Sequence, residues 1–190
     1  MQDEMNIVAF PRSGNVFLNE LLKVGFADSH KHRVFWHAHD LRLLKNNQVI
    51  TVVRNPYDSL YSLFNELKNE ETFSIPLDLV SINKETNEPD YIYWNNRFLL
   101  ETLKCKDNLT LIDFPELISN PVEIVEKIAH KFEVKASEFE IESLMKTMYS
   151  KYERHVPQTT KIIDKALDLK IKENEFYEES LEIYASIFSL

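Results

Sequence analysis

The chain alternates between short apolar runs, which predict strands, and longer stretches with the apolar spacing of a helix. Residues 7–22 contain this unit in full, because an apolar run leads through a polar turn with Arg12 and Gly14 into a helix. One face of that helix carries Leu18, Leu21, Leu22 and Gly25 at positions i, i+3, i+4 and i+7. The first unit of the fold is therefore predicted to be a strand, a turn and a helix.

The same unit occurs a second time. Residues 33–37 predict a strand, after which Asp40 is expected to cap a short helical turn that runs to Lys45. Residues 48–53 predict a third strand, and its nearly unbroken apolar, β-branched character is typical of a parallel strand buried on both faces. A helix follows Arg54-Asn55-Pro56, with an apolar face made by Leu60, Leu63, Phe64 and Leu67.

Further along, the helical period fades over residues 69–90, which indicates a long loop, and it returns in a helix at 91–103. Residues 109–113 predict a fourth strand. A helix is then expected over 121–132, followed by one that starts at a capping box of Ser137 with Glu140 and runs to Met148.

The last part of the chain is a polar connection at residues 150–163 and an amphipathic stretch at 173–190. The apolar stripe of that stretch predicts packing against the core or against a partner helix, and it consists of Tyr177, Leu181, Tyr184 and Phe188.

Alternating strands and helices indicate an α/β fold. We expect a three-layer, P-loop-like domain with a mainly parallel central sheet flanked by helices, and a helical C-terminal region. A length of 190 residues favours one domain over residues 1–190, with the motif-bearing core at about 6–135 and the helical part at about 136–190. Ligands of such sheets bind at the carboxyl ends of the strands.

Composition and charge narrow the class of protein. The net charge of −9 argues against nucleic acid as a partner, because affinity for phosphate backbones needs clustered cations. Residues 1–62 are close to neutral, with seven Lys or Arg against six Asp or Glu, and this front third could bind a small polyanion. A single cysteine, an acidic N-terminal segment and the lack of a long apolar run predict a cytoplasmic protein without a membrane span.

The turn after the first apolar run has the layout of an anion site. Backbone N–H groups of the turn and of the first helical residues converge on one position, where the helix dipole adds positive potential and Arg12 adds a full charge. The turn lacks the second glycine, the lysine and the hydroxyl of a Walker A loop in register, which disfavours an ordinary Mg-ATP kinase.

A second candidate anion site follows the third strand, in VVRNPYDSLYS. Arg54 ends a buried strand, where its guanidinium could bind a phosphate bidentately, and Ser62 follows eight residues later on the helix. The two loops in this order resemble those of sulfotransferases that use 3′-phosphoadenosine 5′-phosphosulfate (PAPS). The resemblance implies that Arg54 and Ser62 hold the 3′-phosphate. It also implies a 5′-phosphosulfate site made by Arg12, Ser13, Gly14, Asn15, Val16 and Phe17.

Histidines lie between the two loops. The family carries a catalytic histidine after its second strand, so the resemblance implies that His39 is the general base, with His37 near the transferring group and as the alternative base. A neutral imidazole can accept a proton from a hydroxyl at neutral pH. His30 and His32 could extend the pair into a metal site, but no cysteine and no clear third carboxylate ligand accompanies them, so no metal is expected.

The chain departs from the family pattern at Phe114, at Asn15, Val16 and Phe17, which stand where the family usually has Thr-Thr-Trp, and in a late motif. Phe114 stands where the family often has a tyrosine that contacts adenine, and it is expected to keep the stacking contact. Asn15 and Val16 replace two threonines of the phosphosulfate loop. The late motif that closes over the 3′-phosphate is absent as such, and its candidate replacements are Lys151, Arg154 and Lys161.

The resemblance therefore implies a sulfotransferase that moves a sulfuryl group from PAPS to a hydroxyl or amine of a small-molecule or glycan acceptor, without a metal. Two alternatives stay open from the sequence. One is a small-molecule or nucleotide kinase of the P-loop class, and the other is a binding protein that has kept the fold without turnover. The apolar stripe near the end of the chain also allows a homo-oligomer.

Overall fold

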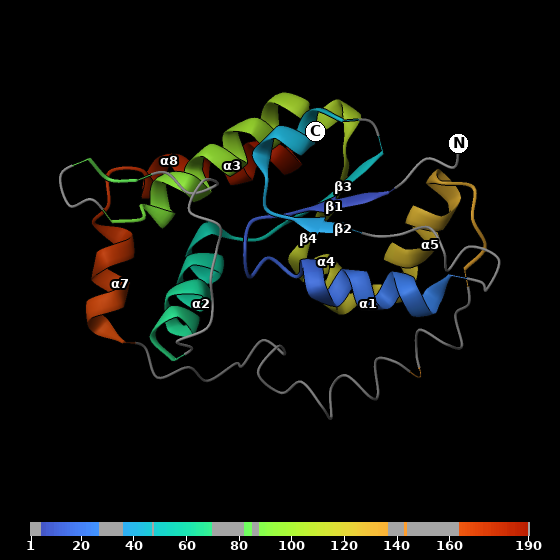
Figure 1. Cartoon of the computed structure of the whole chain (residues 1–190), viewed down its shortest axis with the longest axis horizontal. Helices are drawn as coiled ribbons and strands as arrows, with labels where there is room; N and C mark the ends of the chain where they lie inside the picture. Colours follow the sequence, from blue (N-terminus) through green and yellow to red (C-terminus); the bar gives the residue numbers. More distant parts are fainter. Residues whose placement is uncertain are drawn as a thin grey trace.

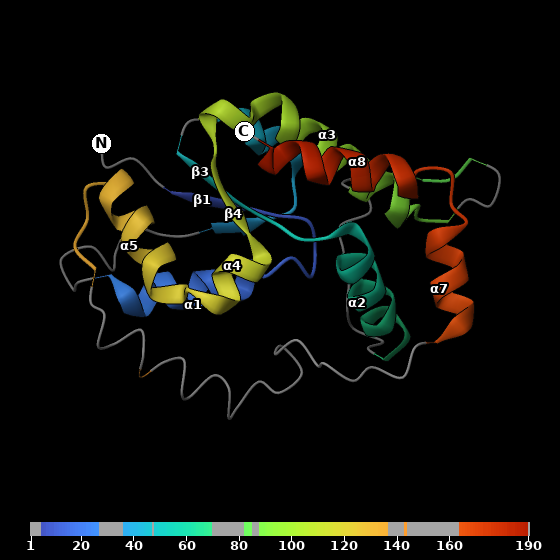
Figure 2. The ribbon, with the colours of Figure 1, turned by 180° about the vertical axis from the view of Figure 1, so that it is seen from behind.

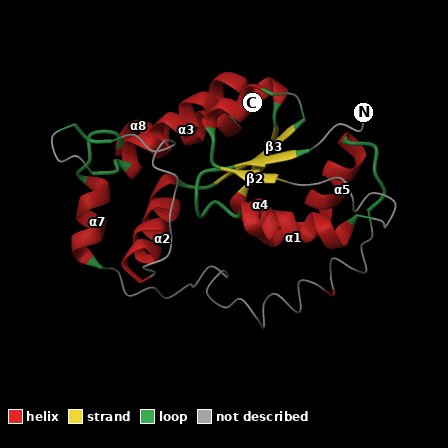
Figure 3. Ribbon diagram, in the orientation of Figure 1, coloured by secondary structure: helices red, strands yellow, loops and turns green. Residues whose placement is uncertain are grey.

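A computed structural model describes residues 5–26, 36–46, 48–69, 82–84, 88–136, 143 and 164–189. Its central sheet consists of β1 (Asn6–Val8), β2 (Trp36–Ala38), β3 (Val49–Val53) and β4 (Thr110–Asp113). The strands lie in the order β2-β1-β3-β4, and each neighbouring pair is parallel (Figures 1 and 3). The prediction of an α/β fold with a parallel central sheet is therefore confirmed.

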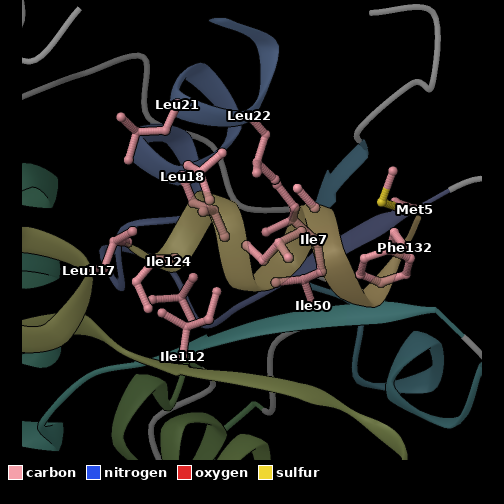
Figure 4. Close-up of a cluster of buried hydrophobic side chains, with 14 of the residues drawn as sticks. Met5, Ile7, Leu18, Leu21, Leu22, Ile50, Ile112, Leu117, Ile124 and Phe132 are labelled. Carbon is pink, nitrogen blue, oxygen red and sulfur yellow. The ribbon is translucent and has the colours of Figure 1, made fainter. Parts of the chain in front are cut away.

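Alternate strand residues enter different apolar clusters on the two faces of the sheet. On one face, Ile7, Ile50 and Ile112 pack against α1 (Asn15–Gly25) and α5 (Pro121–Lys131), as Figure 4 shows. On the other face, Val8 and Val49 join a cluster with residues of the following helices. All five residues of β3 are buried, as expected for a parallel strand between two helical layers.

The helices form a layer on each side of the sheet (Figures 1 and 2). The short helix α4 (Phe114–Ser119) joins α1 and α5 on the first face. On the second face, α3 (Tyr91–Cys105) and α8 (Tyr177–Phe188) lie side by side. The last two, α2 (Pro56–Asn69) and α7 (Lys165–Lys172), pack on each other beyond the carboxyl end of β3. Two 3₁₀ turns, η2 (Leu41–Lys45) and η3 (Lys106–Asn108), complete the described elements.

Hydrogen bonds fasten α7 to α2. The hydroxyl of Tyr57 donates to Asp168 at 2.6 Å, and the hydroxyl of Tyr61 accepts from the backbone N–H of Asp164 at 2.8 Å. The side chain of Asp164 also caps α7 and forms an ion pair with Lys68 at 2.6 Å. Burial, together with the bond to Asp168, raises the pKa of Tyr57. These contacts fix the direction of α2, the helix that carries Ser62.

The structure also corrects parts of the sequence-based prediction. The helix α4 lies between the predicted strand at 109–113 and the predicted helix at 121–132, where no element was expected, and α7 lies in the predicted helical part but was not itself located. The buried face of α8 consists of Tyr177, Ser180, Ile183 and Ile187, whereas the predicted stripe ends on Phe188, which is exposed. Ser180 can face the interior because its hydroxyl donates to the carbonyl of Phe176 at 2.7 Å. The predicted helix at 137–148 and the connection at 150–163 lie outside the described residues, apart from Ser143.

Candidate active site

The loops that follow β1, β2 and β3 meet at one edge of the sheet, because these strands are parallel neighbours. They bring together the turn at residues 9–14, His39 and Arg54. Two predicted site residues cannot be placed in this group. The side chain of His37, in β2, and the whole of Arg154 lie outside the described part of the chain.

The turn after β1 has an unusual backbone. Arg12 and Gly14 have positive φ angles of 65° and 95°, in the left-handed region that favours glycine. A Cβ atom at Gly14 would also lie 2.6 Å from the ring of Phe114. The first backbone N–H groups of α1 have no acceptor within the helix, and no side chain among the described residues caps them. Together with the helix dipole, these groups favour an anion.

The side chains of the turn differ in exposure. Ser13 and Asn15 are buried, while Val16, in the place of a family threonine, is 51% exposed. Phe17 is partly buried against the apolar cluster below α1. The backbone of Ser13 to Phe17 is therefore better suited than the side chains to contact a ligand from this turn.

The guanidinium of Arg12 points to α2. Its Nε donates to the hydroxyl of Ser62 at 3.1 Å, and one terminal nitrogen lies 3.5 Å from a carboxylate oxygen of Glu66. Ser62 was predicted to hold the 3′-phosphate together with Arg54, and that role stays a prediction; in the structure its hydroxyl accepts from Arg12. Glu66 was not identified from the sequence. The available signal was its position four residues after Ser62, on the same face of the helix.

Arg54 extends from the end of β3 into the same region. One terminal nitrogen donates to the backbone carbonyl of Arg12 at 2.8 Å, and the guanidinium lies over the ring of Phe114, 4.4 Å from its centroid. Its Nε is buried and has no hydrogen-bond partner among the described residues. Burial lowers the pKa of Arg54, Asp58 opposes this shift, and Arg12 adds to it. An unpaired buried N–H group of a cation is a donor that an anionic ligand can satisfy.

The next two residues explain why α2 starts here. The side chain of Asn55 accepts from the backbone N–H of Tyr57 at 2.9 Å, and its backbone carbonyl accepts from that of Ser59 at 3.1 Å. Pro56 is the first residue of the helix, where a missing N–H has no cost. Asn55 therefore supplies the cap, and the side chain of Arg54 takes no part in it.

His39 lies at the carboxyl end of β2. Its Nδ1 is 2.6 Å from the carbonyl oxygen of Ala9, at the end of the neighbouring β1. Because a carbonyl can only accept, Nδ1 is the donor in this contact, and in the neutral form of the ring the lone pair is on Nε2. The ring also meets Trp94 edge-on, at 6.4 Å between centroids. These two contacts orient the imidazole.

Asp40, beside this histidine, has a structural role. Its carboxylate accepts from the backbone N–H of Arg42 at 2.9 Å and caps η2, as predicted. Hydrogen bonds from Arg42 lower the pKa of this carboxyl group. Within the described residues, no group of three or more His, Cys, Asp or Glu is placed to hold a metal ion. His30 and His32 lie outside those residues.

Phe114 is buried, with 8% of its surface exposed, between Gly14 and Arg54. Its ring separates the two turns and supports both. The predicted contact with adenine stays a prediction.

A comparison with known protein families agrees with the resemblance found in the sequence. The sulfotransferase domain family matches residues 32–182, which include His39, Arg54 and Ser62. The chain belongs to the sulfotransferase family. The match begins after the turn that carries Arg12, so the placement of that turn in the site rests on the parallel pairing of β1 with β2 and β3.

A solved structure agrees at the level of the fold. The crystal structure of mouse sulfotransferase SULT7A1 complexed with PAP superposes with a TM-score of 0.57 at 19% sequence identity. The aligned region covers 77% of this chain and 65% of that one, so the chain spans slightly less than two thirds of the length of its structural relative. None of the curated proteins matches the chain.

None of the helices in the described residues is long and apolar enough to cross a membrane.

Proposed function

We propose that this sulfotransferase transfers a sulfuryl group from PAPS to a hydroxyl or amine of a small-molecule or glycan acceptor. The main support is the pair of arginines at the sheet edge, joined through the carbonyl of Arg12 and placed beside an uncapped helix N-terminus. The buried Nε of Arg54, which has no partner within the part of the chain that the structure describes, fits a ligand with an anionic group at that position. The structural relative is complexed with PAP, which has two separate phosphate positions.

Each residue then has a distinct task. Arg54 anchors the 3′-phosphate, with Ser62 nearby, and the backbone N–H groups of residues 13–17 hold the 5′ end of the nucleotide. PAPS, when bound, supplies the activated sulfuryl group. Arg12 stabilises negative charge that develops on the leaving phosphate, because a fixed cation in a partly buried site needs no reorganisation.

His39 is the proposed general base. With its Nδ1 proton donated to the carbonyl of Ala9, the lone pair on Nε2 can accept the proton of the acceptor hydroxyl. This assignment places the proton transfer between the ends of β1 and β2, beside the turn of Arg12. His37 remains the alternative base.

The experiment is a thermal-shift comparison of adenosine 3′,5′-bisphosphate, 5′-AMP and Mg-ATP. A ligand that binds only the native protein raises its melting temperature by mass action, so the bisphosphate should give the largest shift. A larger shift with Mg-ATP would favour the kinase. A shift with the bisphosphate, but no transfer of radiolabelled sulfate from PAPS to a panel of acceptors, would favour a binding protein without turnover.

A further inference from the structure

The two arginines of the site differ in their counter-ions. Arg12 has a carboxylate partner, Glu66, whereas Arg54 forms no ion pair with any described residue. Both guanidinium groups belong to one cluster, since Arg54 donates to the backbone carbonyl of Arg12. Arg12 also contributes to the lowered pKa of Arg54, after burial as the main cause.

Glu66 is held in place for this contact. It follows Ser62 by one helical turn on α2, so both side chains reach the same guanidinium. The side chains of Arg12 and Glu66 are only 18% and 20% exposed, and water therefore screens their attraction less than that of a surface pair. The direction of α2 is in turn fixed by its hydrogen bonds to α7.

We propose that Glu66 is a built-in counter-ion that competes with an anionic ligand for Arg12 and thereby sets the affinity of the site. In the protein without a ligand, Glu66 compensates the charge of Arg12. An anion that reaches the cluster must share this arginine with a carboxylate that repels it. The affinity for donor and product is consequently lower than two arginines and a helix N-terminus would give. For the nucleotide ligand, this inference rests on the proposed function.

The test compares anion affinity in the full chain and in Glu66→Gln, which removes the charge and keeps the shape. The probes are adenosine 3′,5′-bisphosphate, measured by calorimetric titration, and inorganic sulfate, measured by thermal shift. We expect Glu66→Gln to bind both about tenfold more tightly, since a unit charge several ångströms from the anion is removed from a partly buried site. A purely structural role for Glu66 predicts weaker binding instead.

Three further variants make the result specific. Glu126→Gln removes the same charge from an exposed position on α5 and should leave both affinities within about twofold. Glu66→Asp keeps the charge and should resemble the unmodified protein. Glu66→Ala should reproduce the gain, and it replaces the Gln variant if that variant does not fold.

Unchanged or weaker binding of both probes by Glu66→Gln, or the same gain in Glu126→Gln, overturns the proposal. So does a lack of measurable binding of either probe by both proteins. A tenfold gain for sulfate, with the bisphosphate bound no better than 5′-AMP, supports the counter-ion and contradicts the proposed function. The two hypotheses can therefore fail separately.

Discussion

An arginine follows each of the strands β1 and β3, and the two arginines differ in their backbone conformation and in the partners of their side chains. After β1, the backbone itself is unusual, with positive φ angles at Arg12 and Gly14, and the arginine side chain is paired with Ser62 and Glu66. After β3, φ is negative and Asn55 caps the next helix. The side chain of Arg54 has a buried nitrogen that no other residue in the described part of the chain pairs with.

This difference indicates a division of tasks. An arginine that is paired with a carboxylate of the protein can exchange this carboxylate for another anion. An arginine without such a carboxylate is stabilised most by an anionic ligand that stays bound. The end of β1 also holds the ring of His39 through the carbonyl of Ala9. We therefore expect loss of His39 to act on the rate of transfer and loss of Arg54 to act on affinity.

The largest effect is expected for His39→Ala. Loss of a general base should lower kcat by about 10²- to 10⁴-fold, while the affinity for adenosine 3′,5′-bisphosphate stays within about twofold. Steady-state kinetics and calorimetry check the two parts. His130→Ala, at an exposed position on α5, is the control and should leave both unchanged. A full rate in His39→Ala would assign the base to another residue, with His37 next to be tested.

Gly14→Ala tests the contact between the turn after β1 and the ring of Phe114, which also supports Arg54. The new methyl group would lie 2.6 Å from the ring of Phe114, on a backbone with φ of 95°. We expect a loss of about 2–4 kcal/mol in the free energy of unfolding, measured with urea. Adding Phe114→Leu to this variant should recover part of the loss, and purely additive changes would show that the ring contact does not cause it.

Arg54→Ala tests whether the arginine after β3 binds the nucleotide. Removal of the guanidinium should weaken binding of adenosine 3′,5′-bisphosphate by more than tenfold, because a buried charged donor is lost. Arg54→Lys should recover little, since an ammonium cannot reproduce both the planar contact with Phe114 and the bond to the carbonyl of Arg12. Unchanged affinity in Arg54→Ala, measured by calorimetry, would contradict the assignment of this arginine.

The smallest effect concerns Asp113, which ends β4 next to Val53 of β3. Burial raises the pKa of Asp113, although the hydroxyl of Tyr184 donates to it at 2.8 Å. The folded protein therefore holds this proton more tightly than the unfolded chain does. Stability from this group is present below the usual pKa of an aspartate and is lost as the pH rises through the raised value.

Asp113→Asn keeps the acceptor for Tyr184 and removes this titration. Its free energy of unfolding should vary less between pH 4 and pH 7 than that of the unmodified protein, and at pH 7 the variant should be slightly more stable. Urea unfolding at the two pH values measures the difference. A steeper pH dependence in the variant would exclude burial as the dominant cause.

The sequence predicted the sheet well, because a parallel strand buried on both faces is a continuous apolar run, as in β3. It also predicted the cap at Asp40, whose signal is local. Contacts between side chains far apart in the sequence were harder to predict. The pairing of Arg12 with Ser62 and Glu66 depends on the direction of α2, which contacts with α7 determine.

Two helices show a second reason for error. In α8 the stripes through Leu181 and through Ser180 are neighbours on the helix surface. Ser180 is acceptable inside because its hydroxyl donates to the carbonyl of Phe176 and accepts from the side chain of Asn96. In α4, a start at Phe114-Pro115 and a length of six residues leave too little periodicity to detect.

The contact between α2 and α7 bears on how the protein is made. Tyr57 and Asp168 are 111 residues apart in sequence, and Tyr61 and Asp164 are 103 apart. On the ribosome, the segment with Ser62 and Glu66 emerges long before the residues that fix its direction. Such distant contacts close slowly, so we expect the sheet to assemble first and the anion site to reach its final geometry among the last events of folding.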